Sequence, residues 1–193
     1  MVVSRAVTLG DDNEAFVIEV ADTTRALQDL ARYVRRQSGA KVIAITGSAG
    51  KTTTKDTIAD FLSTRFAVVK NTGNLNNHLG LPLSLIELRR GADVAVMQLG
   101  MNHAGEIRTL VDVATPDVRV WTNVGEAHIG NFGSSEAIAD AKAEILEGAT
   151  EASLVIANAD DARVRSRLGA FAGRVVTFGT AEDADVRAVD VED

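Results

Sequence analysis

Short apolar runs alternate along this chain with segments in which apolar residues recur at helical spacing. The runs are rich in β-branched residues and predict buried strands. They lie at 42–45, 67–69, 93–99, 117–124, 153–157 and 174–178. The intervening segments repeat with the period of an amphipathic helix. They lie at 22–36, 51–66, 82–90, 104–114 and 134–148, with a shorter one around Val164 and Leu168.

This alternation of strand and helix predicts an α/β fold, a doubly wound and mostly parallel sheet. Ligands of such sheets bind beyond the carboxyl ends of the strands. Polar residues follow several of the predicted strands, namely Gly47–Thr52, Gln98, Asn102, His103, Asn123, His128 and Asn158. We therefore expect the functional site at this edge of the sheet.

The stretch KVIAITGSAGKTTT (41–54) has the layout of a phosphate-binding loop. A predicted strand leads into a turn of small residues, and a Lys-Thr pair opens the next helix. Backbone N–H groups and the positive end of that helix can bind phosphate oxygens. Lys51 adds a charge at the outer phosphates, and a threonine hydroxyl can ligate Mg²⁺. Only Ser48 and Ala49 separate the two glycines, a shorter spacer than the usual pattern has, so the flanking strand and helix carry the prediction.

Composition narrows the function further. A chain of 193 residues that is 46% hydrophobic suits one α/β domain. A net charge of −7 without a Lys/Arg block argues against a nucleic-acid surface. The absence of cysteine excludes a disulfide, a zinc–thiolate site and a thiol nucleophile. Because no apolar run approaches a membrane span and the first residues lack the pattern of a signal peptide, we expect a cytoplasmic protein without membrane insertion.

Six motifs, in this order, resemble those of the Mur ligases. They are TGSAGKTTT (46–54), GNLNNHLGLP (73–82), QLGMNHAGEI (98–107), TNVGEAHIGNFGS (122–134), AKAEIL (141–146) and NADD (158–161). The short glycine turn is the normal form in this family. The resemblance implies a central ATP-binding domain over residues 21–193, with residues 1–20 as the remnant of an N-terminal UDP-sugar-binding domain and the C-terminal domain absent.

Within the family, the motifs resemble those of the ligases of peptidoglycan precursor synthesis that add D-alanyl-D-alanine to UDP-N-acetylmuramoyl-tripeptide. The resemblance implies ATP and Mg²⁺ as cofactors and an acyl phosphate as the intermediate. Such a reaction needs no protein nucleophile, because the protein positions the reactants and neutralises charge. We expect a monomer that is inactive without the missing domains.

The resemblance also assigns roles to individual residues. Gly47, Ser48, Ala49, Gly50, Lys51, Thr52 and Thr53 would hold the phosphates, with Thr52 on Mg²⁺. His128 would ligate a second Mg²⁺, and Lys142 would be carbamylated by CO₂. Asn158 would contact adenine, and Asn74, Asn76, Asn77 and His78 would face the substrate. From the residues alone, Lys142 also fits a solvated helix lysine beside Asp140 and Glu144, the asparagine-rich stretch fits a surface loop, and Asn158 fits a strand-end turn.

One position departs from the family pattern. Gln98 stands where the family carries a glutamate that ligates magnesium, and Mg²⁺ favours carboxylates. Gln98 either ligates weakly through its carbonyl oxygen or leaves the metal site impaired. The alternatives to a ligase of this type are therefore a nucleotide-binding domain that has lost ligation, a related ligase of folylpolyglutamate or cyanophycin type, and a general P-loop NTPase.

Overall fold

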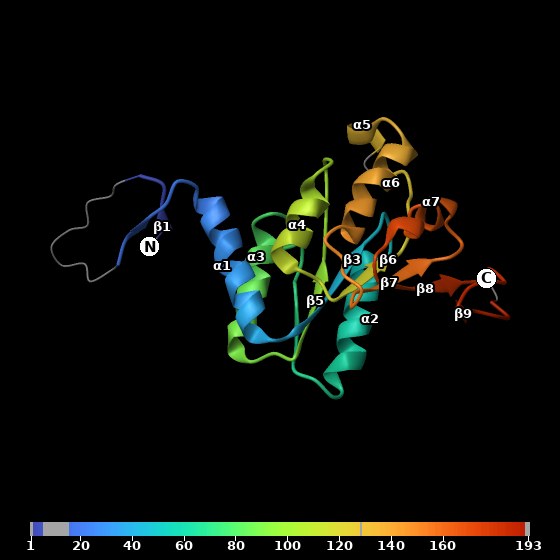
Figure 1. The fold of residues 1–193 in the computed structure, drawn as a ribbon, viewed down its shortest axis with the longest axis horizontal. Helices are drawn as coiled ribbons and strands as arrows, with labels where there is room; N and C mark the ends of the chain where they lie inside the picture. Colours follow the sequence, from blue (N-terminus) through green and yellow to red (C-terminus); the bar gives the residue numbers. More distant parts are fainter. Residues whose placement is uncertain (1, 6–15, 128, 192–193) are drawn as a thin grey trace.

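Seven parallel strands form the central sheet of the protein (Figure 1). The computed structural model describes residues 2–5, 16–127 and 129–191. The strand order is β4-β5-β3-β6-β7-β8-β9. The strands are β3 (Lys41–Thr46), β4 (Val68–Lys70), β5 (Val94–Gln98), β6 (Val118–Trp121), β7 (Leu154–Asn158), β8 (Arg174–Gly179) and β9 (Val186–Arg187). The predicted parallel α/β sheet is confirmed.

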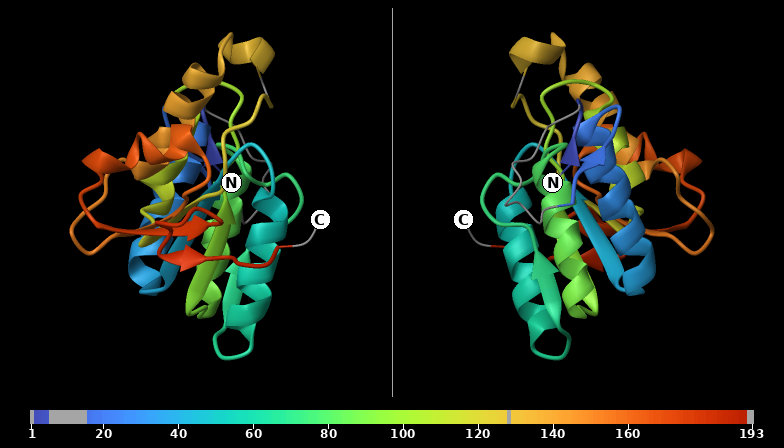
Figure 2. Two further views of the ribbon diagram at one scale, coloured as in Figure 1. Left: turned by 90° about the vertical axis from the view of Figure 1, so that its right-hand side faces the viewer. Right: turned by 90° about the vertical axis from the view of Figure 1, so that its left-hand side faces the viewer.

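Helices cover both faces of this sheet (Figure 2). On one face, Ala59 of α2 (Lys51–Ser63) packs with Ile45 and Val96. The opposite face carries the larger core, to which the other helices contribute. These are α1 (Thr23–Ser38), α3 (Gly80–Ile86), α4 (Glu106–Ala114), α6 (Ser135–Ala143) and α7 (Ala162–Arg165). Strands enclosed in this way are apolar along their whole length, which explains the uninterrupted apolar runs of the sequence.

Two predicted helix starts are confirmed by their caps. The Asp22 carboxylate accepts hydrogen bonds from the N–H groups of Thr24 and Arg25, at 2.7 and 3.0 Å, and so begins α1. The Ser134 hydroxyl accepts from the N–H of Ala137 at 3.1 Å and begins α6. These side chains satisfy N–H groups that have no partner within the first helical turn.

Other boundaries differ from the prediction because side chains take over backbone hydrogen bonds. The predicted strand 117–124 ends at Trp121, since the next two residues turn to hold the glycine loop. The predicted helix at 104 begins at Glu106, after Gly105 with φ 86°. The predicted helix at 82 begins at Gly80, where the Asn77 side chain accepts from the N–H of Gly80 at 2.9 Å.

Short elements complete the chain. The predicted helix 134–148 ends as an α-helix at Ala143 and continues as the 3-10 turn η2 (Glu144–Leu146). The remaining turns are η1 (Glu87–Arg90) and η3 (Leu168–Ala170), and α5 (Ile129–Phe132) is a helix that the sequence pattern did not predict. β1 (Val2–Val3) and β2 (Ile18–Glu19) form a separate two-stranded parallel sheet beside α1 (Figure 1). In the described part of the chain, no helix has both the length and the apolar character to cross a membrane.

Buried charges fix the amino-terminal end of the sheet. Asp117, just before β6, accepts from the N–H of Val42 at 2.9 Å and pairs with Arg35 of α1 at 2.7 Å. Arg119 is 1% exposed and donates to the carbonyl oxygens of Ile145, Pro116 and Glu147. A buried guanidinium is tolerated when its donors are paired. These contacts set β3 and β6 in register and leave their carboxyl ends to carry the site.

Candidate nucleotide site

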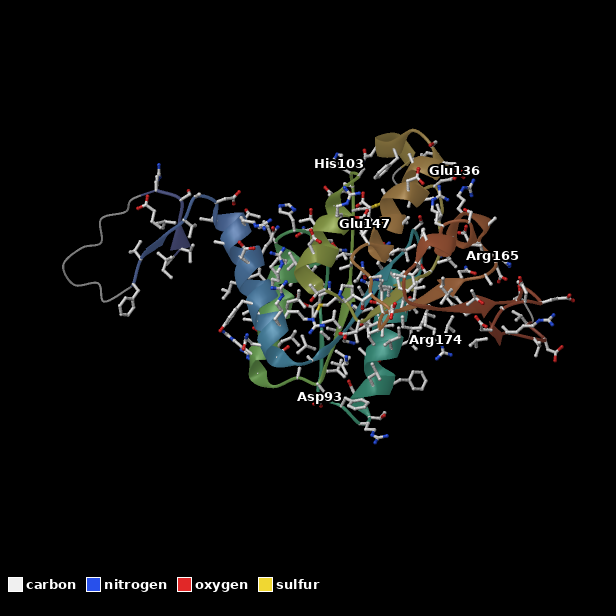
Figure 3. The ribbon with its side chains drawn as sticks, viewed as in Figure 1. Asp93, His103, Glu136, Glu147, Arg165 and Arg174 are labelled. Carbon is white, nitrogen blue, oxygen red and sulfur yellow. The ribbon has the colours of Figure 1, made fainter. Side chains whose placement is uncertain are left out.

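The polar residues that follow the strands gather at one end of the sheet. Figure 3 shows Asp93, before β5, and His103, after it, at opposite ends of the molecule, and the site lies at the His103 end. His103 itself is exposed, and its Nδ1 lies 3.2 Å from Oε1 of Glu106, the first residue of α4. Glu106 also accepts from the N–H of Asn102 at 2.6 Å. Asn102 and His103 thus form the start of α4 at the rim of the site.

The glycine loop needs its two glycines for different reasons. Gly47 has φ 152°, and a Cβ at this position would lie 1.9 Å from the Thr122 hydroxyl oxygen. Gly50 has φ 77° and is the N-cap of α2. Glycine adopts such backbone conformations without the steric penalty of other residues. The first glycine therefore permits a close approach to β6, and the second turns the chain into the helix.

Thr122 and Asn123 hold this loop in place. The Asn123 side-chain oxygen accepts from the N–H groups of Ser48 and Ala49, at 3.1 and 2.9 Å, and its amide donates to the carbonyl of Ala49 at 3.2 Å. The Thr122 hydroxyl donates to the same carbonyl at 2.8 Å. The first half of the loop is thereby bound to the end of β6.

The second half of the loop keeps its donors free. In the part of the chain that the structure describes, no protein group accepts a hydrogen bond from the N–H groups of residues 50–53. The first bond of α2 runs from the Thr54 N–H to the Gly50 carbonyl, at 2.9 Å. Free N–H groups and the helix dipole together form a binding site for anions.

Two lysines from distant parts of the chain meet behind this loop. Lys51 Nζ donates to the carbonyls of Gly47 and Ser48, at 2.7 and 3.3 Å. Lys142 Nζ, from the last turn of α6, donates to the same Gly47 carbonyl at 3.0 Å. Burial lowers the pKa of Lys51. Burial, and then the charge of Lys51, lower the pKa of Lys142 to about 8.

The environment of Lys142 excludes one of the two interpretations of its sequence position. Its side chain is buried, with 2% of the residue exposed, so the interpretation as a solvated helix lysine is wrong. Nor does Glu144 pair with it, because the Glu144 carboxylate accepts from the N–H groups of Gly105 and Arg108, at 2.7 and 3.0 Å. A buried cation without a bonded carboxylate is unfavourable unless an anion joins it.

Thr52 and Gln98 come together as their predicted roles require. The Thr52 hydroxyl donates to Gln98 Oε1 at 2.9 Å, between the first turn of α2 and the end of β5. Both oxygens are neutral. In the described residues, no three His, Asp or Glu side chains lie close enough to hold a metal ion. Because Mg²⁺ is commonly bound by few protein oxygens together with substrate phosphates, the pair fits a magnesium ion that arrives with a nucleotide. His128 lies outside the described residues, and its predicted role stays a prediction.

A cavity of about 540 Å³ opens beside these groups. Lys51, Gln98 and Lys142 line one side of it. The predicted substrate residues line the other, namely Asn74, Asn76, Asn77 and His78. The asparagine-rich stretch thus borders the same cavity as the phosphate loop. Another cavity, of about 520 Å³, lies at the opposite end of the sheet around Asp117 and Arg119 and contains none of the predicted site residues.

Asn158 ends β7 next to the loop without touching it. Its side-chain amide donates to the Thr122 carbonyl at 2.9 Å, and its oxygen accepts from the N–H of Asp160 at 2.8 Å. The second bond makes the strand-end turn that the sequence also suggested. The contact with adenine stays a prediction.

Sequence reasoning did not assign Asn71, Thr122 or Asn123 to the site. Asn123 had been placed at the carboxyl edge of the sheet, but its grip on the loop depends on the pairing of β3 with β6. Asn71 is 2% exposed and bonded to both Gln98 and the asparagine loop. A buried asparagine directly after an apolar strand is the signal that could have identified it.

Comparison with known proteins places this geometry in a family. The Mur ligase middle domain family matches residues 45–193. A UDP-N-acetylmuramoyl-tripeptide–D-alanyl-D-alanine ligase of Bacillus subtilis is 42% identical over 187 residues, covering 97% of this chain and 40% of that protein. The ligase of that name from Escherichia coli is 42% identical over 142 residues, covering 74% and 31%. The chain therefore spans about two fifths or less of the length of these relatives.

Solved structures agree. MurF from Acinetobacter baumannii superposes with a TM-score of 0.90 at 38% identity, covering 99% of this chain and 41% of that one. MurF from Thermotoga maritima in complex with ADP gives 0.83 at 31% identity, covering 93% and 41%. A folylpolyglutamate-type neighbour from L. casei, at 18% identity and a TM-score of 0.62, shares the fold alone.

Proposed function

Since the chain belongs to the Mur ligase family through its middle domain, we propose that it is the ATP-binding part of a ligase that joins D-alanyl-D-alanine to UDP-N-acetylmuramoyl-tripeptide. The similarity to ligases of that name supports this substrate pair over a folylpolyglutamate or cyanophycin type. Residues 21–193 would form the ATP-binding domain and residues 1–20 the end of a preceding UDP-sugar domain. The cytoplasmic location and the monomeric state stay predictions.

One observation carries the nucleotide part of this proposal. The unpaired N–H groups of residues 50–53 open a helix beside two lysines that have no bonded carboxylate. Anions bind at helix N-termini because the N–H groups and the dipole both favour negative charge. The β- and γ-phosphates of ATP supply that charge, and Lys51 can turn from the Gly47 carbonyl to the outer phosphate. The ADP bound to the Thermotoga maritima relative supports the same ligand here.

The reaction balances without a protein nucleophile. A carboxylate oxygen of the tripeptide attacks the γ-phosphorus of ATP, and ADP leaves. The amino group of D-alanyl-D-alanine then attacks the acyl phosphate carbon, loses a proton, and inorganic phosphate leaves. The residues of the chain hold the two reactants in line and neutralise the phosphates, which is how phosphoryl transfer is generally catalysed. A magnesium ion between the phosphates, Thr52 and Gln98 would supply additional charge neutralisation.

Lys142 is the residue we propose to be carbamylated. Only a neutral amine adds CO₂, and a pKa of about 8 leaves roughly a tenth of Lys142 neutral at pH 7. The product carries a negative charge next to Lys51, which replaces an unfavourable pair of cations by an ion pair. The carbamate would also offer an oxygen to magnesium in a site whose protein oxygens are otherwise neutral.

The other side of the cavity is the proposed site of the acceptor substrates. Asn74, Asn76, Asn77 and His78 present short amide and imidazole groups to the space beside Lys51. Such groups bind the carboxylates and peptide bonds of a substrate by hydrogen bonding. Asn158, at the end of β7, is the proposed contact with adenine on the far side of the glycine loop from this cavity.

The observation at Gln98 favours a second candidate function, a nucleotide-binding domain that no longer ligates. The Gln98 side chain keeps the contact with Thr52 and lacks a negative charge. Restoring the charge with Gln98→Glu should tighten Mg²⁺ binding in the presence of ADP by about tenfold, measured by calorimetry. Thr52→Ser, which keeps the hydroxyl, is the matched control. An unchanged Mg²⁺ affinity in Gln98→Glu would show that the position no longer bears on metal binding.

Phosphate release distinguishes the three functions. A ligase releases phosphate from ATP only when the tripeptide precursor and D-alanyl-D-alanine are both present. A general NTPase releases it without them, and a domain that only binds nucleotide releases none. Since the chain spans only part of its relatives, the assay is run both on the chain and on a longer protein that continues to the length of those relatives.

A further inference from the structure

Asn71 lies behind the cavity and does not line it. It follows β4 directly, and its side chain makes three hydrogen bonds of 2.9 Å. Its oxygen accepts from the N–H of Gln98, and its amide donates to the carbonyls of Gln98 and Leu75. The residue is 2% exposed, so each of these bonds forms away from water, where losing a partner is costly.

The side chain of Asn71 extends the sheet by one residue. The backbone pairing of β4 with β5 ends where Lys70 lies opposite Val96. Beyond that point the Asn71 carboxamide, which has the same donor and acceptor as a peptide group, binds both the N–H and the carbonyl of Gln98. The last residue of β5 is thereby held as firmly as the strand before it. Its side chain then leaves the backbone from a fixed position and meets the Thr52 hydroxyl.

A ring of contacts closes through α2. Lys55, one helical turn after Thr52, is 3% exposed and donates to the Asn71 carbonyl oxygen at 2.8 Å. The ring runs from Thr52 to Gln98, to Asn71, to Lys55 and back along α2. The bond from Asn71 to Leu75 attaches the asparagine loop to the same ring. One buried residue therefore connects the phosphate side of the cavity with its other wall.

We propose that Asn71 is a positioning residue, which holds Gln98 against Thr52 and sets the distance between the two walls of the cavity. This inference rests on the proposed nucleotide function. Asn71 touches no nucleotide itself, so removing it leaves the N–H groups of residues 50–53 and Lys51 in place. What it changes is the placement of the two oxygens that would take part in binding magnesium. The signature is a loss of the benefit that Mg²⁺ gives to nucleotide binding, with the metal-free affinity retained.

The test measures ADP binding by calorimetry with and without Mg²⁺ for the unchanged chain, Asn71→Ala and the milder Asn71→Thr. The ratio of the two dissociation constants should fall by about tenfold in Asn71→Ala, while the metal-free constant changes by less than about threefold. Gln28→Ala is the matched control. Gln28 is also a buried carboxamide, and it anchors the asparagine loop at the His78 carbonyl without touching Gln98.

Three outcomes decide the proposal. A ratio that is unchanged in both Asn71 variants overturns it, and so does an equal loss in Gln28→Ala, because loosening of the loop would then be the cause. Failure of the unchanged chain to bind ADP contradicts the proposed function, and amide exchange then tests the clamp alone. Exchange at Gln98 should accelerate in Asn71→Thr relative to Val96, and equal rates would show that Asn71 does not hold Gln98.

Discussion

Lys142 is the residue whose chemistry changes most between the unfolded chain and the folded protein. In water a lysine keeps its proton to a pKa of 10.5, whereas here burial and then the charge of Lys51 lower the pKa to about 8. Each unit of pKa shift corresponds to about 1.4 kcal/mol, so the protonated side chain costs the fold about 3 kcal/mol. The chain keeps at this position a group that opposes its stability, which is typical of a functional site.

The first prediction follows from this cost. Below pH 8 both states carry the proton, and the cost is fully present. Between pH 8 and 10.5 the folded state releases the proton while the unfolded chain keeps it, so the contribution of Lys142 to stability rises with pH. Lys142→Met should therefore be more stable by about 2 kcal/mol at pH 7, after the loss of one hydrogen bond, and the difference should shrink towards pH 10.5.

Urea unfolding of both proteins across this pH range, without bicarbonate, measures the difference directly. Because all other groups titrate equally in the two proteins, their contributions cancel. A difference that stays constant between pH 7 and 10.5 would contradict a lowered pKa. Bicarbonate added near pH 8 should stabilise the unchanged chain and leave Lys142→Met unaffected, since only the former can form the carbamate.

The glycine loop shows how an element depends on a neighbour that lies far along the chain. Gly47→Ala should displace the loop from β6, because the new Cβ would overlap the Thr122 hydroxyl. We expect a loss of stability of about 1–3 kcal/mol from strain and overpacking and a loss of ADP binding by at least about tenfold. Gly130→Ala is the control, since nothing lies within 4 Å of a Cβ there. Equal ADP affinity in the two variants would show that the close approach to β6 is unnecessary.

Elements were predictable where their signal is local. The apolar runs identified the strands of the parallel sheet because both faces of that sheet are covered, and Asp22 and Ser134 marked helix starts. Ends shifted where a side chain replaced a backbone partner, as at Thr122. The site was predictable in its loop and strand-end residues. Its depth was not, because the bond of Lys142 to Gly47 spans 95 residues and exists only after the sheet has assembled.

The whole described sheet shares its interior across most of the helices, and this predicts cooperative unfolding. Trp121 is the single tryptophan of the chain and is fully buried in the larger core. Its fluorescence should be blue-shifted in the folded state and move to longer wavelength in one urea transition. That transition should coincide with the loss of far-ultraviolet circular dichroism, as for a two-state domain. Two separated transitions would mean that the core around Trp121 unfolds independently of the other elements.

Binding of a non-hydrolysable ATP analogue, measured by calorimetry with and without Mg²⁺, tests the central claim most directly. The free N–H groups of residues 50–53 and the lysines beside them predict binding that Mg²⁺ strengthens and that Lys51→Ala weakens by at least about tenfold. Trp121 fluorescence verifies that the variant is folded. Absence of binding in the folded, unchanged chain, or equal binding by Lys51→Ala, would contradict the account of this edge of the sheet as a nucleotide site.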